Sequence, residues 1–265
     1  MPKKLKVIKV GGNVINDKEI LHQFLDLFAK IEEPKILVHG GGSIASELAE
    51  TFQIPPKMVQ GRRVTDGAML DIVVMSYAGL INKNIVASLQ KRSCNAMGLS
   101  GADANYFKTV KRPVEEIDYG FVGDCVDDSV NVEFLKLLLE NGITPTSCAI
   151  THDTQGNLFN TNADTIAASI AKAMSKDYEV ELIYCFELPG LLRDIELPDS
   201  KIDTLNLEKI EALKKDGTIH SGMHPKIDNC KDAILNGVSK VFICHWKDVV
   251  QPKNGTSILG FKEMA

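Results

Sequence analysis

Two glycine-rich turns near the start of the chain have the residue types that could bind a phosphate. Lys9-Val10-Gly11-Gly12 and His39-Gly40-Gly41-Gly42 each follow an apolar run and precede an amphipathic segment. Glycine lets the backbone approach a ligand closely, and the free amides at a helix N-terminus attract anions. Neither turn fits the P-loop pattern or the dinucleotide-binding fingerprint. One such turn can simply reverse the chain, but two in the same strand–turn–helix context favour a phosphate site.

Two lysines beside turns could neutralise the charge of a bound anion. Lys9 stands at the end of the first predicted strand, which is where open α/β sheets bind ligands. Lys226 falls in the first turn of a predicted helix, within Gly222-Met223-His224-Pro225-Lys226. A cation is unfavourable at that end of a helix, so a bound anion explains Lys226 better than helix stability does. The alternative for both residues is an ordinary solvated lysine.

A polar segment and an arginine pair could bind the second substrate of such a site. Asn160-Thr161-Asn162-Ala163-Asp164 places two amides and a carboxylate two residues apart at the start of a predicted helix. Asn162 or Asp164 could be an ordinary helix cap, and capping accounts for only one of them. Arg63, which follows Arg62, could grip a carboxylate with both arms of its guanidinium or lie solvated at a hairpin tip.

An α/β fold must position these residues. Short β-branched runs alternate with longer amphipathic segments, the pattern of a largely parallel sheet covered by helices. The predicted strands are Leu5–Val10, Lys35–His39, Asn95–Gly98, Thr144–Ile150, Glu181–Cys185 and Lys240–Ile243. The predicted helices are Asp17–Lys30, Ser43–Phe52 with Ser43 as its cap, Asp66–Arg92, Asn131–Asn141, Ala163–Met174, Leu207–Lys215 and Lys226–Leu235. Hairpins are predicted over Met58–Val64 and Thr109–Asp128, and a polar loop over Thr151–Asn162.

The helix predicted over Asp66–Arg92 is unusually apolar, with hydrophobic residues on more than one face. Such a helix must be buried on more than one side. The second side could be covered within the fold or by another subunit.

Composition limits the classes of partner. The 265 residues carry 30 Lys and Arg against 35 Asp and Glu, a formal net charge of −5, which argues against a general nucleic-acid binder. No signal-peptide core and no uninterrupted apolar run of bilayer-spanning length is visible. The six cysteines form no C-x-x-C pair, and neither they nor the histidines have metal-ligand spacing. We therefore expect a cytoplasmic protein that binds neither nucleic acid nor membrane and has no structural metal.

Taken in order, these motifs resemble the amino-acid kinase family. The resemblance rests on the two glycine turns, Gly61-Arg62-Arg63-Val64-Thr65, the Asn160–Asp164 segment and the segment that ends at Lys226, and it spans nearly the whole chain. Gly98–Asp103 and Asp118–Gly123 also look like middle segments of the family. The members most similar to this chain phosphorylate N-acylated glutamate in arginine biosynthesis.

The resemblance implies phosphoryl transfer from MgATP to the side-chain carboxylate of an N-acylglutamate. Lys9 and Lys226 would contact the transferring phosphoryl group from opposite sides, and Asp164 would hold both ammonium groups by ion pairing. The implied phosphate-binding residues are Gly11, Gly12 and Gly42. The implied amino-acid site contains Gly41, Gly42, Arg63 and Asn160. Mg²⁺ enters with ATP, and no protein-bound metal or prosthetic group is implied.

The resemblance also implies an open, mostly parallel sheet sandwiched between helices, as in carbamate kinase. We expect one domain, residues 1–265, with an N-terminal lobe of about 1–150 for the amino acid and dimerisation. The C-terminal lobe, about 151–265, would bind ATP. Arginine-inhibited members carry an additional N-terminal helix; because the first strand begins by Leu5, we expect a homodimer without that feedback.

Two departures from the family pattern lie on the ATP side. Cys185–Leu191 replaces a usual Thr/Ser-Asp-x-x-Gly-Val segment, and Ser221 replaces a usual glycine. The acyl pocket is not readable from the sequence, so acetyl and succinyl substrates both stay open. The alternative from another class is a catalytically silent sensor of amino acid and nucleotide. Retention of Lys9, Asp164 and Lys226 together argues against it, because binding alone does not need two lysines at one phosphoryl group.

Overall fold

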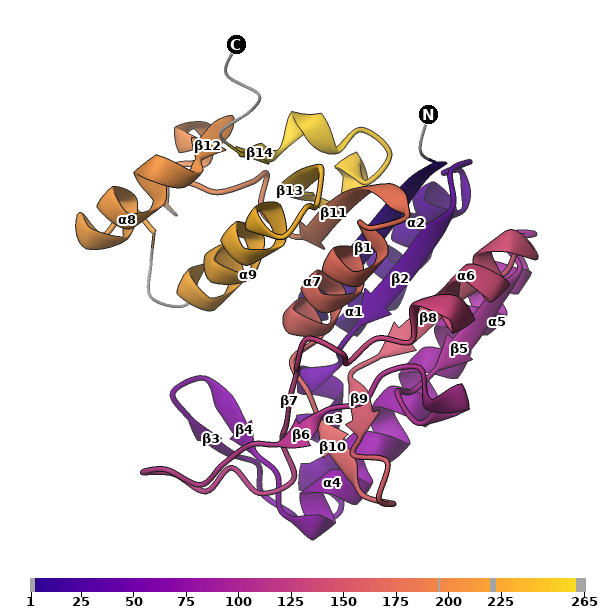
Figure 1. Cartoon of the computed structure of the whole chain (residues 1–265). Helices are drawn as coiled ribbons and strands as arrows, with labels where there is room; N and C mark the ends of the chain where they lie inside the picture. Colours follow the sequence, from indigo (N-terminus) through magenta and orange to yellow (C-terminus); the bar gives the residue numbers. More distant parts are fainter. Residues whose placement is uncertain (1–2, 195, 220–222, 261–265) are drawn as a thin grey trace.

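The longer strands form one twisted sheet in the computed structural model (Figure 1). The structure describes residues 3–194, 196–219 and 223–260. Within them, the sheet has eight strands in the order β12-β14-β13-β11-β1-β2-β8-β5, all parallel to their neighbours except the pair β13–β14. The strands are β1 Lys3–Val10, β2 Lys35–His39, β5 Ala96–Leu99, β8 Thr144–Cys148, β11 Tyr178–Phe186, β12 Thr204–Asn206, β13 Lys240–His245 and β14 Thr256–Leu259. The predicted open, mostly parallel sheet is confirmed.

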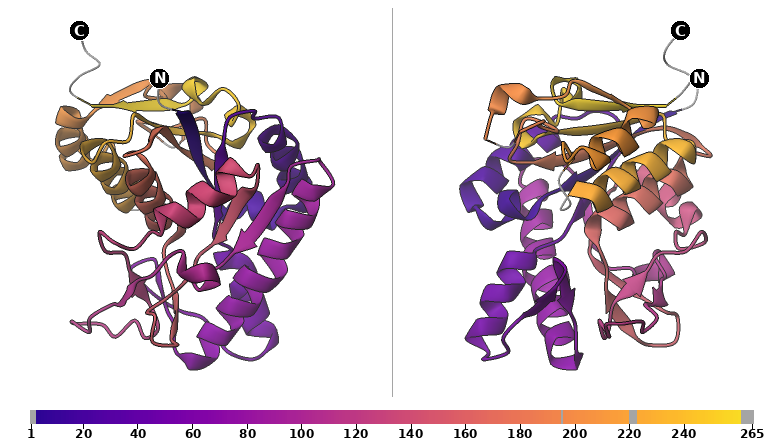
Figure 2. Two further views of the ribbon diagram at one scale, coloured as in Figure 1. Left: turned by 45° about the vertical axis from the view of Figure 1, so that its right-hand side comes forward. Right: turned by 90° about the vertical axis from the view of Figure 1, so that its left-hand side faces the viewer.

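Helices cover both faces of this sheet (Figures 1 and 2). One layer holds α6, α7 and α9, and the opposite layer holds α2 and the helical rod formed by α4 and α5. The helices are α1 Gly12–Asn16, α2 Lys18–Ala29, α3 Gly42–Thr51, α4 Gly67–Val74, α5 Asn82–Gln90, α6 Val132–Glu140, α7 Ala163–Met174, α8 Leu207–Lys215 and α9 His224–Leu235. The central strands are buried because helices lie on both sides, as their nearly continuous apolar sequences require.

Small hairpins gather beyond the carboxyl ends of the central strands, in the lower part of Figure 1. They are β3 Lys57–Val59 with β4 Arg62–Val64, β6 Val110–Lys111 with β7 Gly123–Asp124, and β9 Ile150–His152 with β10 Leu158–Asn160. The first two hairpins were expected from the sequence. The third corrects a prediction, because Thr151–Asn162 was expected to be a loop. Isolated bridges Thr65–Gly120 and Val122–Asn160 join the three hairpins.

The long helix predicted over Asp66–Arg92 is continuous but changes pitch. Asp66 caps its start by accepting a hydrogen bond from the Met69 amide at 2.9 Å. Between α4 and α5 the segment Met75–Ile81 is a π-helix, a form that often marks functional positions. The rod packs against α2, α3, β5 and β8. Burial within the fold therefore accounts for one side of this helix.

By length and composition, the same helix could cross a bilayer. Gly67–Gln90 has 24 residues and a mean hydropathy of 1.4, with 44% of its apolar window buried inside the fold. Its sequence is not an uninterrupted apolar run, because polar residues such as Asp71 and Lys83 interrupt it. Its buried residues pack against the sheet and its neighbours, as in the core helix of a globular fold.

One other local prediction is corrected by the structure. Ser43 does not cap α3, because the helix begins at Gly42 and Gly41 precedes it without a side-chain cap. The strand predicted over Lys240–Ile243 is confirmed within β13, and β14, which was not predicted, follows it and pairs antiparallel with it. The short strand β12 then pairs with β14 at the edge of the sheet.

Candidate active site

Lys9, Asp164 and Lys226 come together at the carboxyl edge of the sheet. Lys9 Nζ lies 2.8 Å from Asp164 Oδ1, and Lys226 Nζ donates to Asp164 Oδ2 at 2.7 Å. Lys226 makes an aligned hydrogen bond, whereas Lys9 makes a close ion pair without hydrogen-bond angles at Oδ1. The three side chains are only 14%, 17% and 15% exposed. Lys9 and Lys226, which lie 155 and 62 positions from Asp164 in the sequence, thus share its carboxylate.

The two lysines keep Asp164 ionised. Burial by itself would raise the pKa of this carboxyl, but the charges of Lys9 and Lys226 and the hydrogen bond from Lys226 outweigh it and hold the pKa well below its usual range. For Lys9, burial is the largest influence and lowers the pKa below its usual value; Lys226 acts in the same direction, and Asp164 opposes both. Three charged groups with a net positive charge therefore stand in a largely dry position, where an additional anion would be stabilised.

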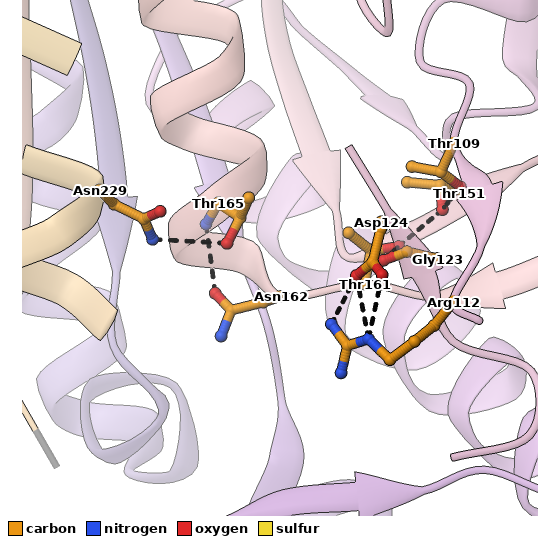
Figure 3. A network of polar contacts seen from close by, with 9 residues as sticks. All are labelled: Thr109, Arg112, Gly123, Asp124, Thr151, Thr161, Asn162, Thr165 and Asn229. Carbon is orange, nitrogen blue, oxygen red and sulfur yellow. Dashed lines mark hydrogen bonds and ion pairs between the residues drawn. The ribbon is translucent and has the colours of Figure 1, made fainter. Parts of the chain in front are cut away.

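The Asp164 carboxylate is free to face the lysines because Asn162, and not Asp164, caps helix α7. Asn162 Oδ1 accepts a hydrogen bond from the backbone N–H group of Asp164 at 2.7 Å. It accepts a second from the backbone N–H group of Thr165 at 3.2 Å (Figure 3). Asn229 of α9 donates to Thr165 Oγ1 at 3.4 Å, which ties the two helices together. Of the two candidate caps, Asn162 is the cap, and the carboxylate of Asp164 stays free to pair with lysine.

Lys226 is the third residue of α9, so the predicted position in a first helical turn is confirmed. No described acidic side chain in that turn offsets it, and its charge is paired with Asp164 of another helix. The preceding residues Gly222 and Ser221, which the sequence analysis singled out, lie outside the described residues.

The first glycine turn is open on one side. The Gly11 amide donates to Cys185 O at 2.9 Å, which fixes the turn against the end of β11. A Cβ built on Gly12 would meet no heavy atom within 4 Å. Asn13 Nδ2 donates to Glu187 Oε1 at 2.7 Å, so the segment that departs from the family pattern touches this turn. The open space therefore lies beside Gly12, the first residue of α1.

The second glycine turn is packed. Gly41 has a φ of +154°, and a Cβ there would lie 2.1 Å from Ile81 Cδ1 in the π-helical segment. A Cβ on Gly40 would lie 3.8 Å from the Ala163 Cβ at the start of α7. This turn therefore adjoins both the long helix and the helix that carries Asp164. Only glycine fits at Gly41, because both the backbone angle and the space exclude a side chain.

His39 contacts the backbone of this second turn, and the sequence analysis assigned it no role. Its Nδ1 lies 2.9 Å from Gly40 O, and Asn82 Nδ2 lies 3.0 Å from its Nε2. Asn82 also donates to Thr146 O at 2.9 Å. These contacts require a neutral ring that donates from Nδ1 and accepts at Nε2. Burial lowers the pKa of His39 to about 4, in agreement with a neutral imidazole.

Arg63 lies beside the second turn without an acidic partner. Its Nη2 donates to Gly42 O at 2.8 Å and to Ser46 Oγ at 2.7 Å. The residue is 9% exposed, and it forms no ion pair with the residues that the structure describes. The adjacent Arg62 is exposed instead, because successive residues of strand β4 point to opposite sides. The predicted arginine pair is thus split, and the buried member is suited to bind a carboxylate.

Asn160 is linked through Thr65 to the segment that carries Arg63. Its Nδ2 donates to Thr65 Oγ1 at 3.1 Å, and Thr65 follows Arg63 by two residues. A buried row of hydroxyl groups supports the segment: Thr109 to Thr151 at 2.8 Å, Thr151 to Thr161 at 2.7 Å, and Thr161 Oγ1 to Gly123 O at 3.3 Å (Figure 3). The hairpins around Asn160 are therefore joined to one another next to the start of α7.

Two cavities, of about 470 and 370 Å³, lie away from these residues. The smaller one lies at the amino ends of β2, β5 and β8. Its buried lysine, Lys35, already donates to Ala29 O at 3.1 Å and Ile31 O at 2.5 Å. The candidate active site is therefore the charged cluster, where the glycine turns and the carboxyl ends of the strands meet, the position at which open α/β sheets bind ligands.

The fold and the charged cluster are those of an α/β kinase. Residues 4–245 match the amino acid kinase family, and the chain belongs to this family. The resemblance deduced from the motifs is confirmed. Among solved structures, carbamate kinase from Giardia lamblia bound to AMP-PNP has the same fold, with a TM-score of 0.72 and 16% identity. That match covers 97% of this chain and 99% of the Giardia chain.

Curated relatives are similar over their whole length. Acetylglutamate kinase of Cytophaga hutchinsonii is 51% identical over 263 residues, which is 99% of this chain and 99% of the relative. Acetylglutamate kinase of Bacteroides thetaiotaomicron is 48% identical over 97% of this chain and 99% of the relative. The predicted enzyme class, a phosphotransferase, is confirmed by these relationships.

Proposed function

We propose that this enzyme transfers the γ-phosphoryl group of MgATP to the side-chain carboxylate of N-acetyl-L-glutamate, a step of arginine biosynthesis. The relatives named acetylglutamate kinase support the reaction. The observation that carries the proposal in this chain is the pairing of Lys9 and Lys226 with one buried carboxylate beside two glycine turns. A silent sensor has no need for that arrangement.

The reaction needs positioning and charge neutralisation more than it needs a base. A carboxylate oxygen of the substrate attacks the γ-phosphorus, the bond to the bridging oxygen of ADP breaks, and an acyl phosphate forms. The attacking carboxylate is already ionised at neutral pH, so no proton has to be removed. Lys9 and Lys226 neutralise the charge on the phosphoryl oxygens, and Asp164 holds both ammonium groups in place.

The glycine turns and the polar residues divide the remaining contacts. The amides of Gly12 and Gly42 donate to phosphate oxygens, and Gly11 and Gly41 allow the ligands to approach closely. Arg63 binds the α-carboxylate of the amino acid, and Asn160 binds the acylamide region. Magnesium enters as part of the MgATP substrate.

We extend the proposal to the organisation of the molecule. Residues of about 1–150 form the lobe that binds the amino acid, and residues of about 151–265 form the lobe that binds ATP. The long helix forms the core of a homodimer in the cytoplasm. Met75 and Leu80 on this helix are 48% and 52% exposed, which supports an apolar contact with a second copy. Sedimentation at working concentration tests the dimer, and a monomer contradicts it.

A coupled assay of ADP release tests the reaction. Purified protein is supplied with MgATP and, separately, with glutamate, N-acetylglutamate and N-succinylglutamate. We expect turnover with N-acetylglutamate and none with glutamate, because only the former carries the acylamide. Preferential turnover of N-succinylglutamate would change the assigned acyl group. Measurable ATP binding without turnover of any of the three would identify a sensor and refute the proposal.

A further inference from the structure

Tyr184 contacts the charged cluster at two points. It lies on β11 directly opposite Lys9 of β1 in the parallel register and is 1% exposed. Its hydroxyl donates to the backbone oxygen of Asp164 at 3.0 Å. The centre of its ring lies 4.9 Å from Lys226 Nζ. One aromatic side chain thus touches the backbone of the carboxylate residue and the ammonium group of one lysine.

The ring does something that another acid could not do. A second carboxylate near Lys226 would hold the ammonium group but cancel its positive charge. An aromatic face attracts a cation through its quadrupole and leaves the net charge unchanged. The charge remains available to the phosphoryl oxygens when substrate arrives.

The Tyr184 hydroxyl contacts Asp164. Because burial raises the pKa of Tyr184 well above its usual value, the hydroxyl stays protonated and remains a donor. Its bond to Asp164 O joins the sheet to the first turn of α7, the turn that also presents the Asp164 carboxylate. A leucine of similar burial would fill the space but make neither contact.

We propose that Tyr184 is a positioning residue for phosphoryl transfer: its ring holds the Lys226 ammonium group, and its hydroxyl fixes the backbone of Asp164. This inference rests on the proposed function. A lysine has four rotatable side-chain bonds, so the hydrogen bond to Asp164 alone lets the ammonium group pivot. The ring adds a second point of contact and restricts Lys226 to the side of the cluster where Lys9 lies.

Steady-state kinetics of two variants test the proposal. We expect Tyr184→Leu to lower kcat by about 3- to 30-fold, the range of a cation–π contact. The KM for N-acetylglutamate should stay within about twofold, because Arg63 and Asn160 are untouched. Tyr184→Phe keeps the ring and should retain kcat within about threefold. Should Tyr184→Leu fail to fold, Tyr184→Met provides an unbranched apolar side chain without an aromatic face.

A double-mutant cycle separates positioning from general stability. In a Lys226→Ala background, Tyr184→Leu should lower kcat by no more than Tyr184→Phe does in the wild-type background, because the ring has lost the ammonium group on which it acts and only the hydroxyl contact to Asp164 O is left to lose. Tyr178→Leu, the same change at the far end of β11, should leave kcat unchanged and controls for disturbance of the strand.

Wild-type kcat in Tyr184→Leu would overturn the proposal, and so would equal losses in both backgrounds. Failure of the proposed function has a different signature, since then the wild-type protein itself gives no turnover with any N-acylglutamate.

Discussion

Lys9 and Lys226 share one buried carboxylate, whereas Arg63 forms no ion pair with any residue that the structure describes. In the proposed function, the lysines act on the phosphoryl group and the arginine binds the amino acid. Arg63 Nη2 donates to a backbone carbonyl and a hydroxyl, and Nη1 donates to Met69 Sδ, but none of these neutral acceptors balances its charge.

The difference indicates how each cation works. A lysine pair that is already anchored by Asp164 needs no substrate to adopt its position and can stabilise charge as it develops in the transition state. A buried arginine without a counter-ion gains most when a carboxylate arrives and balances it. We therefore expect the lysines to act on kcat and Arg63 to act on the KM of the amino acid.

Loss of Lys226 should give the largest effect. Lys226→Ala should lower kcat by roughly 10²–10³, the scale for removing one preorganised transition-state contact. Steady-state kinetics with both substrates measure it. If only a KM rises, Lys226 binds the ground state and the contrast with Arg63 disappears.

Acid should lower the stability of the folded protein through His39 and through Asp164 in different pH ranges. The pKa of His39, which contacts the second glycine turn, is about 4 in the folded protein against 6.5 for the free side chain, so the unfolded chain binds a proton first as the pH falls. Stability should therefore fall by about 3 kcal/mol between pH 6.5 and 4. The pKa of Asp164 is lowered instead, so its contribution is lost only as the pH falls through and below about 4.

Urea unfolding at pH 7 and pH 4.5 checks this prediction in wild type and His39→Gln. The variant should be less stable at pH 7 yet lose less stability on acidification, because glutamine takes up no proton. The same loss in both proteins would mean that other groups cause the pH dependence.

Arg63→Lys should raise the KM for N-acetylglutamate roughly tenfold or more, because a charge-assisted hydrogen bond contributes about 1.5–3 kcal/mol. Lysine keeps the charge but loses the planar fork, so kcat should change by less than about threefold. Arg62→Lys is the matched control, since Arg62 is exposed. A loss in kcat without a change in KM would reverse the assignment of the two sides.

The two glycine turns should respond to alanine in opposite ways. Gly12→Ala meets no neighbour, so the fold should be retained and the KM for MgATP should rise about three- to tenfold through partial loss of a phosphate contact. Gly41→Ala collides with Ile81, so stability should fall by about 1–3 kcal/mol. Thermal unfolding and kinetics of both variants distinguish them, and an unstable Gly12→Ala would show that the first turn is also packed.

Local sequence patterns predicted the longer helices and strands well and the shortest strands poorly. β2 and α7 begin and end where their apolar periodicity predicts. The three-residue strands β10 and β12 were missed, because pairing with a neighbour determines them and their own sequences are too short to show alternation. Within the site, Lys9 was recognised from its place at a strand end. His39 and Tyr184 were not assigned roles, since a histidine or tyrosine in a buried strand looks like any core residue.

By itself, the sequence determined the class of chemistry: glycine turns before helices, lysines at their edges, and a polar segment that supplies one cap and one carboxylate. The tertiary structure decided which member of each ambiguous pair has which position. Asn162 caps α7 while Asp164 faces the lysines, and Arg63 is buried while Arg62 is exposed. The physical reason is that burial, ion pairing and pKa depend on neighbours from distant parts of the chain, and only folding brings those neighbours together.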